Sequence, residues 1–571
     1  MLGFRNKMKS FGHTNFDIFF IAITIILISF ILLLFSFVSI ISKHIEMTTE
    51  KLADRNCYLR KISSPDKTWD IVVIGGGATG LGIALDATVR GYKTLLVEQA
   101  DFAKGTSSRS TKLVHGGVRY LAQGDVRLVR EASIERGLLY RNAPHLVKDQ
   151  TFIVPVYTQW DRLKYTVGLK IYDWISGKLS LGRSVFISRK ETIERLPGIR
   201  TKDLKGGVVY HDGQFDDSRL AINLAQSIWE NGGAAINYMR VDGLLKDEHK
   251  NVAGVTARDT ETGELYTFRA KSVVNATGVF VDDILQMDKP GSNKSICVSQ
   301  GVHLVLDKKF YPSSEALMIP DTSDGRVLFA VPWHDKVVLG TTDTPVEEAS
   351  LEPQALEKEI SFILETANNY LATKPGRSDV LSVFAGLRPL AAPQKEEQKT
   401  KEISRSHKII VSESKLFTIL GGKWTTYRKM GEDMVNRIEK ELNWLHKKPA
   451  TASLHIHGYN PDTDWNDPFY FYGSDANLLR QQMNGTANEW LSDELKIHRK
   501  QIIWAVEHEM ARTLEDVLSR RTRALLLNAR ESRRIAPECV SIMAGLMGKD
   551  EQWKQDQLNS FNQLSEQYIL K

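Results

Sequence analysis

The sequence of 571 residues has only three cysteines, Cys57, Cys297 and Cys539. They lie far apart and without the spacing of metal ligands, which argues against a disulfide framework, indicates no metal site and favours a reducing compartment. Lysine and arginine form no long run, no tract is of low complexity, and the net charge is only +6. We therefore expect no nucleic-acid partner.

One long hydrophobic run is present, near the N-terminus. Between Ile18 and Ile41 no residue is charged, and a helix of this length would span a hydrocarbon core of about 30 Å. More basic residues follow the run than precede it, so the positive-inside rule places the main body on the cytoplasmic side. We predict a transmembrane helix within residues 1–46. The alternative is a natural start at Met47, which opens the sequence MTTEKLAD.

A glycine-rich turn follows the first apolar strand. Residues 71–74 read IVVI, as in a parallel strand buried on both faces, and the turn GGGATG leads into a helix. In such a turn the first glycine bends the chain, the second admits a pyrophosphate, and the third lets the helix lie close to the strand. A second strand ends at Glu98, where an acid accepts a hydrogen bond from the adenosine ribose. The predicted dinucleotide-binding residues are Gly75, Gly77, Ala78, Thr79, Gly80 and Glu98.

Two later segments favour FAD over NAD as the dinucleotide. Residues 270–283, AKSVVNATGVFVDD, form an apolar strand that ends in A-T-G, and this resembles the second signature of flavoproteins, where backbone returns to the cofactor. Gly421 and Gly422 lie between another apolar strand and an amphipathic helix. The N-terminus of that helix would stabilise the negative charge of a reduced flavin. An NAD dehydrogenase needs neither feature.

Five longer motifs occur in the order GTSSRSTKLVHGGVRYL (105–121), FAVPWHDKVVLGTTDT (329–344), FAGLRPL (384–390), GGKWTTYRKM (421–430) and AVEHEMARTLEDVLSRRTR (505–523). In sequence and order they resemble the FAD-dependent glycerol-3-phosphate dehydrogenases, the respiratory, quinone-linked enzymes. The resemblance covers roughly residues 69–547. It does not include the N-terminal apolar run.

The resemblance implies FAD as the cofactor and sn-glycerol 3-phosphate as the substrate. Planar arginine donors suit the phosphate of this substrate. The resemblance gives the substrate-binding residues as Arg119, Tyr120, Arg388 and Arg405, of which Arg388 faces the substrate near the flavin and is also a catalytic candidate. Lys423 is a second catalytic candidate, because a lysine beside the flavin could stabilise the reduced ring or the carbonyl oxygen of the product.

Hydride removal from an alcohol also requires a base for the hydroxyl proton. His303, in SQGVHLVL, and His115, in KLVHGG, are the two histidines with motif context, and the sequence does not choose between them. The remaining candidate contacts with the pyrophosphate and the flavin are Thr106, Ser107, Ser108, Lys112, Ala276, Thr277, Gly278, Gly422, Lys423 and Thr425.

We expect an α/β fold with a discontinuous Rossmann-like FAD-binding domain, a mainly antiparallel β substrate cap and an α-helical C-terminal domain. The expected boundaries are 67–121, 206–283 and 380–442 for the FAD-binding domain, 122–205 and 284–379 for the cap, and 443–571 for the helical domain. A basic cluster in the last domain would either face anionic lipid headgroups or form a solvated helix face. Its members are Arg520, Arg521, Arg523, Arg530, Arg533 and Arg534.

The leading functional hypothesis is oxidation of sn-glycerol 3-phosphate to dihydroxyacetone phosphate, with electrons passed to a membrane quinone. The protein would then have the lipid bilayer as a partner and lie at the cell inner (plasma) membrane. The alternatives are an oxidase that passes electrons to oxygen, an amine or 2-hydroxy-acid oxidoreductase of the same superfamily, and a flavoprotein that binds RNA or another protein. The oligomeric state stays open, a homodimer included.

Overall fold

The computed structural model describes residues 55–64, 66–117, 125–177, 181–323, 325–392, 407–485 and 488–571. The chain divides into two compact units, residues 1–58 and 59–571, and helix α2 (Arg55–Ile62) crosses this boundary. The fold described below is that of the second unit. The apolar run at 18–41 lies outside the described residues, and none of the helices within them is long and apolar enough to cross a membrane.

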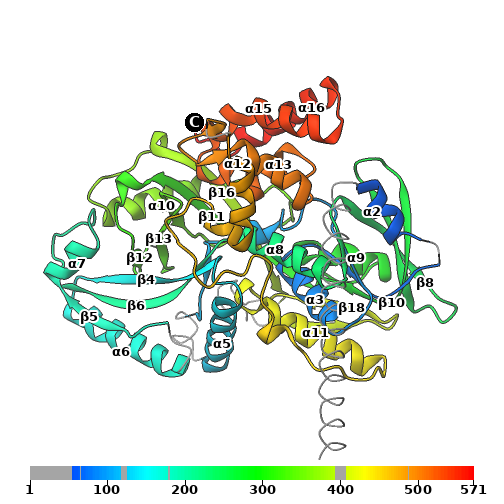
Figure 1. The fold of residues 1–571 in the computed structure, drawn as a ribbon. Coiled ribbons are helices and arrows are strands. Elements are labelled where there is room, and N and C mark those ends of the chain that lie inside the picture. The colour runs from blue at the N-terminus through cyan, green and yellow to red at the C-terminus, as the bar shows by residue number, and fades with distance from the viewer. Residues whose placement is uncertain are drawn as a thin grey trace, which may run out of the picture. The chain divides into compact units, whose positions relative to one another are not determined.

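The first sheet has a parallel centre built from the apolar runs of the sequence. Ile71, Val72 and Val73 of its central strand are fully buried, as expected for a strand covered on both faces. In spatial order its strands are β17 (Lys408–Val411), β18 (Leu416–Leu420), β10 (Leu265–Asn275), β1 (Thr68–Ile74), β2 (Thr94–Val97) and β7 (Ala234–Ile236), and β8 (Met239–Lys246) and β9 (Val252–Asp259) extend from β10. Helices α3 (Ala78–Val89), α8 (Asp217–Glu230), α9 (Val281–Asp288) and α11 (Tyr427–Glu441) belong to this part of the fold (Figure 1).

The second sheet is antiparallel except for the pairing of β12 with β4. Its strands are, in spatial order, β15 (Thr344–Val346), β11 (Ile296–Asp307), β14 (Lys336–Gly340), β13 (Leu328–Trp333), β12 (Ala316–Ile319), β4 (Val147–Val156), β6 (Gly206–Phe215) and β3 (Leu113–Val114), with β16 (Val380–Ala391) paired to β11 and β5 (Val185–Ser188) paired to β6. Its helices are α5 (Val126–Asn142), α6 (Gln159–Ser176), α7 (Arg189–Arg195) and α10 (Glu357–Tyr370).

The two faces of strand β11 have different roles: one packs into the hydrophobic core and the other lines a cavity. Its even-numbered residues Val302, Leu304 and Leu306 pack into a cluster with α10. Because side chains alternate along a strand, the odd-numbered residues point to the other face. On that face His303 lines a cavity and Val305 packs with the C-terminal helices.

Two segments that the sequence analysis assigned to the FAD-binding domain are strands of the second sheet. β6 pairs with β4 over residues 206–215, and β16 pairs with β11 over residues 380–391. These pairings join segments far apart in the chain, and strand patterns alone do not specify them. The other domain boundaries stay a proposal.

The C-terminal region is helical and packs against the second sheet through β14 and β16 (Figure 1). It contains α12 (Ala476–Met483), α13 (Arg499–His508), a π-helix (Asp516–Arg521), α14 (Ala524–Leu527), α15 (Ala529–Met547) and α16 (Glu551–Glu566), with the short strands β19 (Trp490–Ser492) and β20 (Ile497–His498).

The sequence-based expectations for the basic cluster are wrong for three of its arginines. Arg520, Arg521 and Arg523 are buried and form ion pairs with Asp101 and Asp216. A buried charge requires such partners, and the acids lie hundreds of residues away in the sequence. Arg530, Arg533 and Arg534 are exposed.

Candidate active site

A cavity of about 480 Å³ lies at the carboxyl ends of β1 and β2, where parallel sheets place their ligands. Gly75 follows β1 with a φ of +110°, a conformation that favours glycine, and a Cβ there would lie 2.7 Å from the Ala276 carbonyl oxygen. A Cβ at Gly80 would lie 1.8 Å from the Gly75 carbonyl oxygen, so glycine allows α3 to begin close against β1. Ala78 and Thr79 line the cavity at the N-terminus of α3, whose N–H groups favour an anion.

Glu98 directly follows β2 and also lines this cavity. Its Oε2 accepts a hydrogen bond from the Gly76 N–H at 2.6 Å, and its Oε1 accepts one from the Ala100 N–H at 2.9 Å. Burial raises the pKa of the Glu98 carboxyl, and the two N–H donors act in the opposite direction. The acid therefore ties the end of β2 to the glycine turn, at the place where the sequence predicts a ribose contact.

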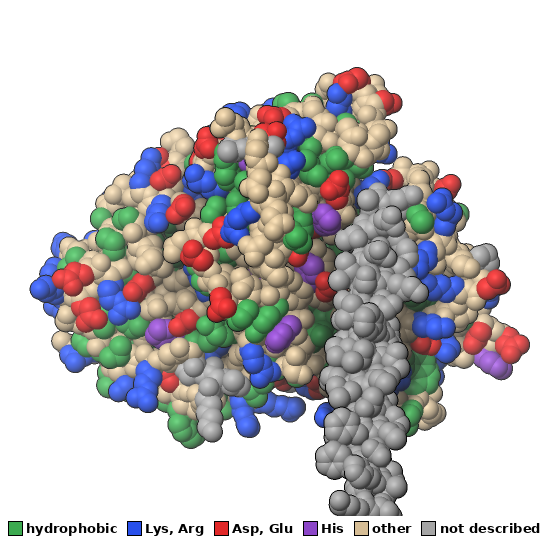
Figure 2. Space-filling model, in the orientation of Figure 1, with side chains coloured by type: hydrophobic (Ala, Val, Ile, Leu, Met, Phe, Trp, Pro, Cys, Tyr) green, Lys and Arg blue, Asp and Glu red, His purple; other side chains and the backbone are tan. Residues whose placement is uncertain are grey.

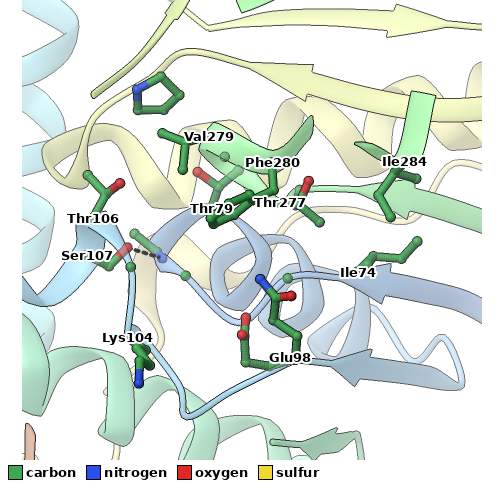
Figure 3. Close-up of a pocket in the computed structure, with 18 of the residues that line it drawn as sticks. Ile74, Thr79, Glu98, Lys104, Thr106, Ser107, Thr277, Val279, Phe280 and Ile284 are labelled. Atoms are coloured by element: carbon green, nitrogen blue, oxygen red, sulfur yellow. Dashed lines mark hydrogen bonds between the residues drawn. The ribbon is translucent and has the colours of Figure 1, made fainter. Parts of the chain in front are cut away.

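The loop after β2 returns to the glycine turn. Ser107 Oγ accepts a hydrogen bond from the Ala78 N–H at 2.9 Å (Figure 3). Trp424, in the turn before α11, donates from Nε1 to the Ser107 carbonyl oxygen at 2.7 Å. Three segments far apart in the chain thus close around the cavity. Sequence reasoning missed Trp424, although it lies inside the motif GGKWTTYRKM.

The opposite wall of the cavity comes from β10, α9 and β8. Thr277, Val279, Phe280 and Ile284 lie across the space from Glu98 and Ser107 (Figure 3). The lining residues from β8 are Met239, Arg240, Val241 and Asp242. Sequence reasoning missed this strand because it carries no motif, and its apolar pattern alone does not distinguish a ligand wall from a core strand.

A second cavity, of about 300 Å³, adjoins the first. The two share the lining residues Thr106, Pro389, Gly421, Gly422, Lys423 and Trp424. The second cavity also brings together all four catalytic candidates from the sequence, which are His115, His303, Arg388 and Lys423, together with Thr425. One continuous site therefore runs from the glycine turn to these four side chains.

Arg388 extends from β16 across β11. Its guanidinium donates to the carbonyl oxygens of Gln300 and Thr342 at 3.3 and 3.0 Å, and its Nη1 lies 3.4 Å from Asp343 Oδ1. Gly301 lies beneath it, since a Cβ there would be 2.3 Å from Arg388 Nη2. Sequence reasoning missed Gly301, although a glycine inside a strand is a known sign of close approach.

His303 is held tightly beside Arg388. Its ring stacks on Phe384 with centroids 4.9 Å apart, and its Nε2 lies 2.9 Å from Thr111 Oγ1. Its Nδ1 is buried and has no hydrogen-bond partner among the described residues. Burial lowers the pKa of His303 well below its usual value, and the charge of Arg388 acts in the same direction. The imidazole is therefore neutral at neutral pH.

Three predicted cofactor contacts, Gly80, Ser108 and Lys112, line neither cavity. Lys112 is fully buried, and its Nζ donates to both carboxylate oxygens of Asp217 at 2.7 and 2.8 Å and to the Ser108 carbonyl oxygen at 2.7 Å. The Lys112 charge therefore links the loop at Ser108 to Asp217 at the start of α8, outside the two cavities. The substrate candidates Arg119, Tyr120 and Arg405 lie outside the described residues.

The fold and the site agree with comparisons to protein families. A family model described as FAD dependent oxidoreductase matches residues 70–422, and one described as the C-terminal domain of alpha-glycerophosphate oxidase matches residues 416–554. The protein is thus, by class, an FAD-dependent oxidoreductase. The glycine turn fits this cofactor, because Gly75, Gly77 and the N-terminus of α3 line the first cavity, where backbone N–H groups favour a dinucleotide phosphate.

Individual relatives narrow the class. The chain is 39% identical over 523 residues to a probable mitochondrial glycerol-3-phosphate dehydrogenase of Caenorhabditis elegans, covering 85% of this chain and 71% of that protein. It is 38% identical over 531 residues to the mitochondrial glycerol-3-phosphate dehydrogenase of Homo sapiens, covering 86% of this chain and 72% of that protein. The chain belongs to the family of FAD-dependent glycerol-3-phosphate dehydrogenases.

A solved structure supports the assignment. The glycerol-3-phosphate dehydrogenase from Bacillus halodurans, complexed with FAD, superposes with a TM-score of 0.74 at 31% identity, covering 91% of this chain and 98% of that one. The L-alpha-glycerophosphate oxidase from Mycoplasma pneumoniae, with FAD bound, has a TM-score of 0.53 at 16% identity and shows likeness of fold alone.

Proposed function

We propose that the protein oxidises sn-glycerol 3-phosphate to dihydroxyacetone phosphate. The observation that carries the proposal is the second cavity, where Arg388 of β16 and His303 of β11 lie beside the turn that also lines the FAD cavity. The names of the relatives supply the substrate. FAD, when bound in the first cavity, would supply the acceptor for the hydride of the substrate carbon.

The proposed roles follow from position. The glycine turn, Glu98 and the Thr106–Ser107 loop hold the dinucleotide, together with residues 276–278. Arg388 binds the phosphate, because its guanidinium lines the second cavity and donates to the neutral oxygens of Gln300, Thr341 and Thr342, and a dianion is a stronger acceptor. Lys423 lies at the junction of the two cavities, where its charge would stabilise negative charge on either side.

We propose that the base is one of the two histidines that line the second cavity, His303 or His115. The Thr111 contact holds the His303 ring at Nε2, and burial lowers the pKa of this imidazole, which weakens it as a base. A neutral imidazole can take the hydroxyl proton as the hydride leaves. His115 also lines the cavity, and its role is tested by the same experiment.

We further propose a membrane quinone as the electron acceptor and the inner (plasma) membrane as the location, with the body on the cytoplasmic side. The apolar run at 18–41 supports a membrane location. Several relatives are named as mitochondrial, so cell fractionation must decide between the two kinds of membrane. Measuring peroxide under air separates the quinone-linked enzyme from an oxidase.

The test is anaerobic reduction of the bound flavin. Addition of sn-glycerol 3-phosphate should bleach the oxidised-flavin absorbance, and glycerol or lactate should not. Arg388→Ala should lower kcat/KM roughly ten- to a hundredfold, which corresponds to the loss of one or two charged hydrogen bonds. Arg533→Ala, on the exposed face of α15, is the control and should behave as the wild type. A folded, yellow protein whose flavin stays oxidised would refute the proposed substrate.

A quinone-free readout then tests the base. His303→Gln and His115→Gln are compared by their pH–rate profiles for flavin reduction. Loss of rate at every pH in His303→Gln, with His115→Gln near the wild type, assigns the base to His303. The reverse pattern assigns the base to His115.

A further inference from the structure

The second cavity is lined by a carboxylate that is not among the predicted catalytic or binding residues. Asp212, on β6, borders this cavity and yet is only 3% exposed. A carboxylate at such a depth is costly unless other groups compensate its charge and its hydrogen bonds. The groups that contact Asp212 therefore indicate its role.

Two helices supply side-chain donors to Asp212. Arg136 of α5 donates from Nη1 to its Oδ1 at 2.7 Å, and Tyr172 of α6 donates from Oη to its Oδ2 at 3.1 Å. Burial raises the pKa of Tyr172 well above its usual value, and the charge of Asp212 acts in the same direction. The tyrosine hydroxyl therefore stays protonated and remains a donor.

The burial of these side chains distinguishes them from the ion pairs of the surface. Figure 2 shows acidic and basic side chains interspersed over the visible face, where water and salt weaken each pair. Arg136 and Tyr172 are each 1% exposed, and Tyr172 packs with Leu128 and Val129 of α5. The Asp212 carboxylate is therefore held in one orientation.

A further donor to Asp212 is a backbone group. The Gly116 N–H donates to Asp212 Oδ1 at 3.1 Å. The carbonyl oxygen of the same peptide group, that of His115, accepts a hydrogen bond from Thr425 Oγ1 at 3.4 Å. Because a peptide group is planar, hydrogen bonds to both of its polar atoms fix its orientation. His115, which lines the second cavity, directly precedes this peptide.

Glycine at position 116 allows this close approach. A Cβ there would lie 2.2 Å from Tyr172 Oη. The pairing of β3 with β6 ends at Val114 and Gly213, so the chain leaves the sheet beside Asp212. The carboxylate thus continues the attachment of this segment to β6 beyond the last strand pair.

We propose that Asp212 is a positioning residue for the reaction, which directs His115 into the second cavity through the peptide between His115 and Gly116. Arg136 and Tyr172 contribute by fixing the carboxylate. A misplacement of about 1 Å in a reacting site can lower a rate roughly a hundredfold, so control of this peptide has a measurable effect. The inference rests on the proposed function, in which His115 is either the base or a contact of the substrate.

The test is a double-mutant cycle on anaerobic flavin reduction by sn-glycerol 3-phosphate. Asp212→Asn and His115→Gln should each lower the limiting rate of flavin reduction about tenfold, with the apparent Kd of the substrate changed less than about twofold. The combined variant should be less than about twofold slower than His115→Gln, because Asp212 acts through His115. A combined loss of about a hundredfold would show independent effects and overturn the proposal.

The matched control is Asp149→Asn. Asp149 lies on β4 of the same sheet and pairs at 3.0 Å with His211 of β6, and neither residue lines a cavity. This variant should reduce its flavin at the wild-type rate.

Tyr172→Phe provides a milder variant should Asp212→Asn fail to fold. It removes one donor to Asp212 and leaves the ion pair with Arg136 in place. It should slow flavin reduction about threefold in the wild type and leave the rate of His115→Gln unchanged. Equal slowing in both backgrounds would contradict the proposal.

The remaining outcomes are distinct. If His115→Gln reduces its flavin as fast as the wild type, Asp212 has no reacting group to position and the proposal is wrong. If sn-glycerol 3-phosphate does not reduce the wild-type flavin, the proposed substrate fails, and hydrogen exchange still tests the peptide contact. The Gly116 amide should exchange at least about tenfold faster in Asp212→Asn than in Asp149→Asn, and equal exchange would refute the positioning role.

Discussion

The buried pair of Arg521 and Asp101 allows a stability prediction with a worked magnitude. Both side chains have no exposed surface. Arg521 donates from Nη1 and Nη2 to the two oxygens of Asp101 at 2.7 and 2.9 Å, and from Nη2 to the Glu509 carbonyl oxygen at 2.8 Å. Burial alone would raise the pKa of Asp101, but the charges of Arg521 and Arg520 outweigh it and hold that pKa well below its usual value.

The perturbation is Arg521→Met, which keeps most of the volume and removes the charge. Loss of one partner from a buried ion pair costs about 3–5 kcal/mol, and we expect the lower end because Arg520 still donates to Asp101. Unfolding entropy is about 2.1 cal/mol/K per residue, so a body of roughly 510 residues has about 1.1 kcal/mol/K. A loss of about 3 kcal/mol then lowers the melting temperature by about 3 °C.

The assay is thermal unfolding followed by protein fluorescence and by flavin release. Flavin release should shift at least as far as unfolding, because Asp101 lies in the loop between Glu98 and Ser107 that lines the FAD cavity. Arg533→Met is the control. Arg533 pairs with Glu566 on the exposed surface, so its loss should not shift the melting temperature measurably. An Arg521→Met protein within 1 °C of the wild type would refute the reasoning.

Three further predictions test the site and the fold. Gly80→Ala should prevent FAD retention, since its Cβ would lie 1.8 Å from the Gly75 carbonyl oxygen, whereas Gly545→Ala, in open space on α15, should retain FAD and stabilise the protein by about 0.5–1 kcal/mol. Gly301→Ala should raise KM about tenfold with kcat less affected, because it displaces the Arg388 guanidinium; an unchanged KM in steady-state kinetics would contradict the assigned phosphate contact. His457 tests pH dependence: burial opposes its charge, but Asp475 and Glu230 raise its pKa to about 10, above the unfolded value of about 6.5. Its stabilising effect is therefore complete below pH 6.5 and lost as pH rises through 10, so the melting temperatures of wild type and His457→Gln should differ most in acid and converge in alkali.

The sequence predicted local features of the site well. The turn from Gly75 to Gly80 and the acid at Glu98 belong to one continuous strand–helix–strand segment, so their spacing determines their geometry. His303, Arg388 and Lys423, which the motifs gave as catalytic candidates, line one cavity. These three residues lie on separate segments of the chain, so only the resemblance to a known family indicated that they belong to one site.

Features that depend on distant pairings could not be predicted in this way. The sequences of β6 and β16 do not show that these strands join the second sheet. In the sequence Lys112 looks like an available cation, but in the structure its Nζ donates to both carboxylate oxygens of Asp217 and to the Ser108 carbonyl oxygen. Arg520 and Arg521 of the π-helix look like surface residues in the sequence. Nothing near them in the chain shows that they are buried and form ion pairs with Asp101.

The order of strands in the first sheet has a consequence for synthesis of the protein. β10 ends at Asn275, and its parallel neighbour β18 begins at Leu416. A ribosome that adds 5 to 20 residues per second needs roughly 7 to 29 s to make the intervening chain and β18. During this time residues 273–275 of β10 lack the strand that pairs with them in the finished sheet, and an unpaired apolar edge is a template for aggregation. We therefore expect that this part of β10 is covered during synthesis, by a chaperone or by the intervening chain. The cofactor site is complete only after β18 has been made.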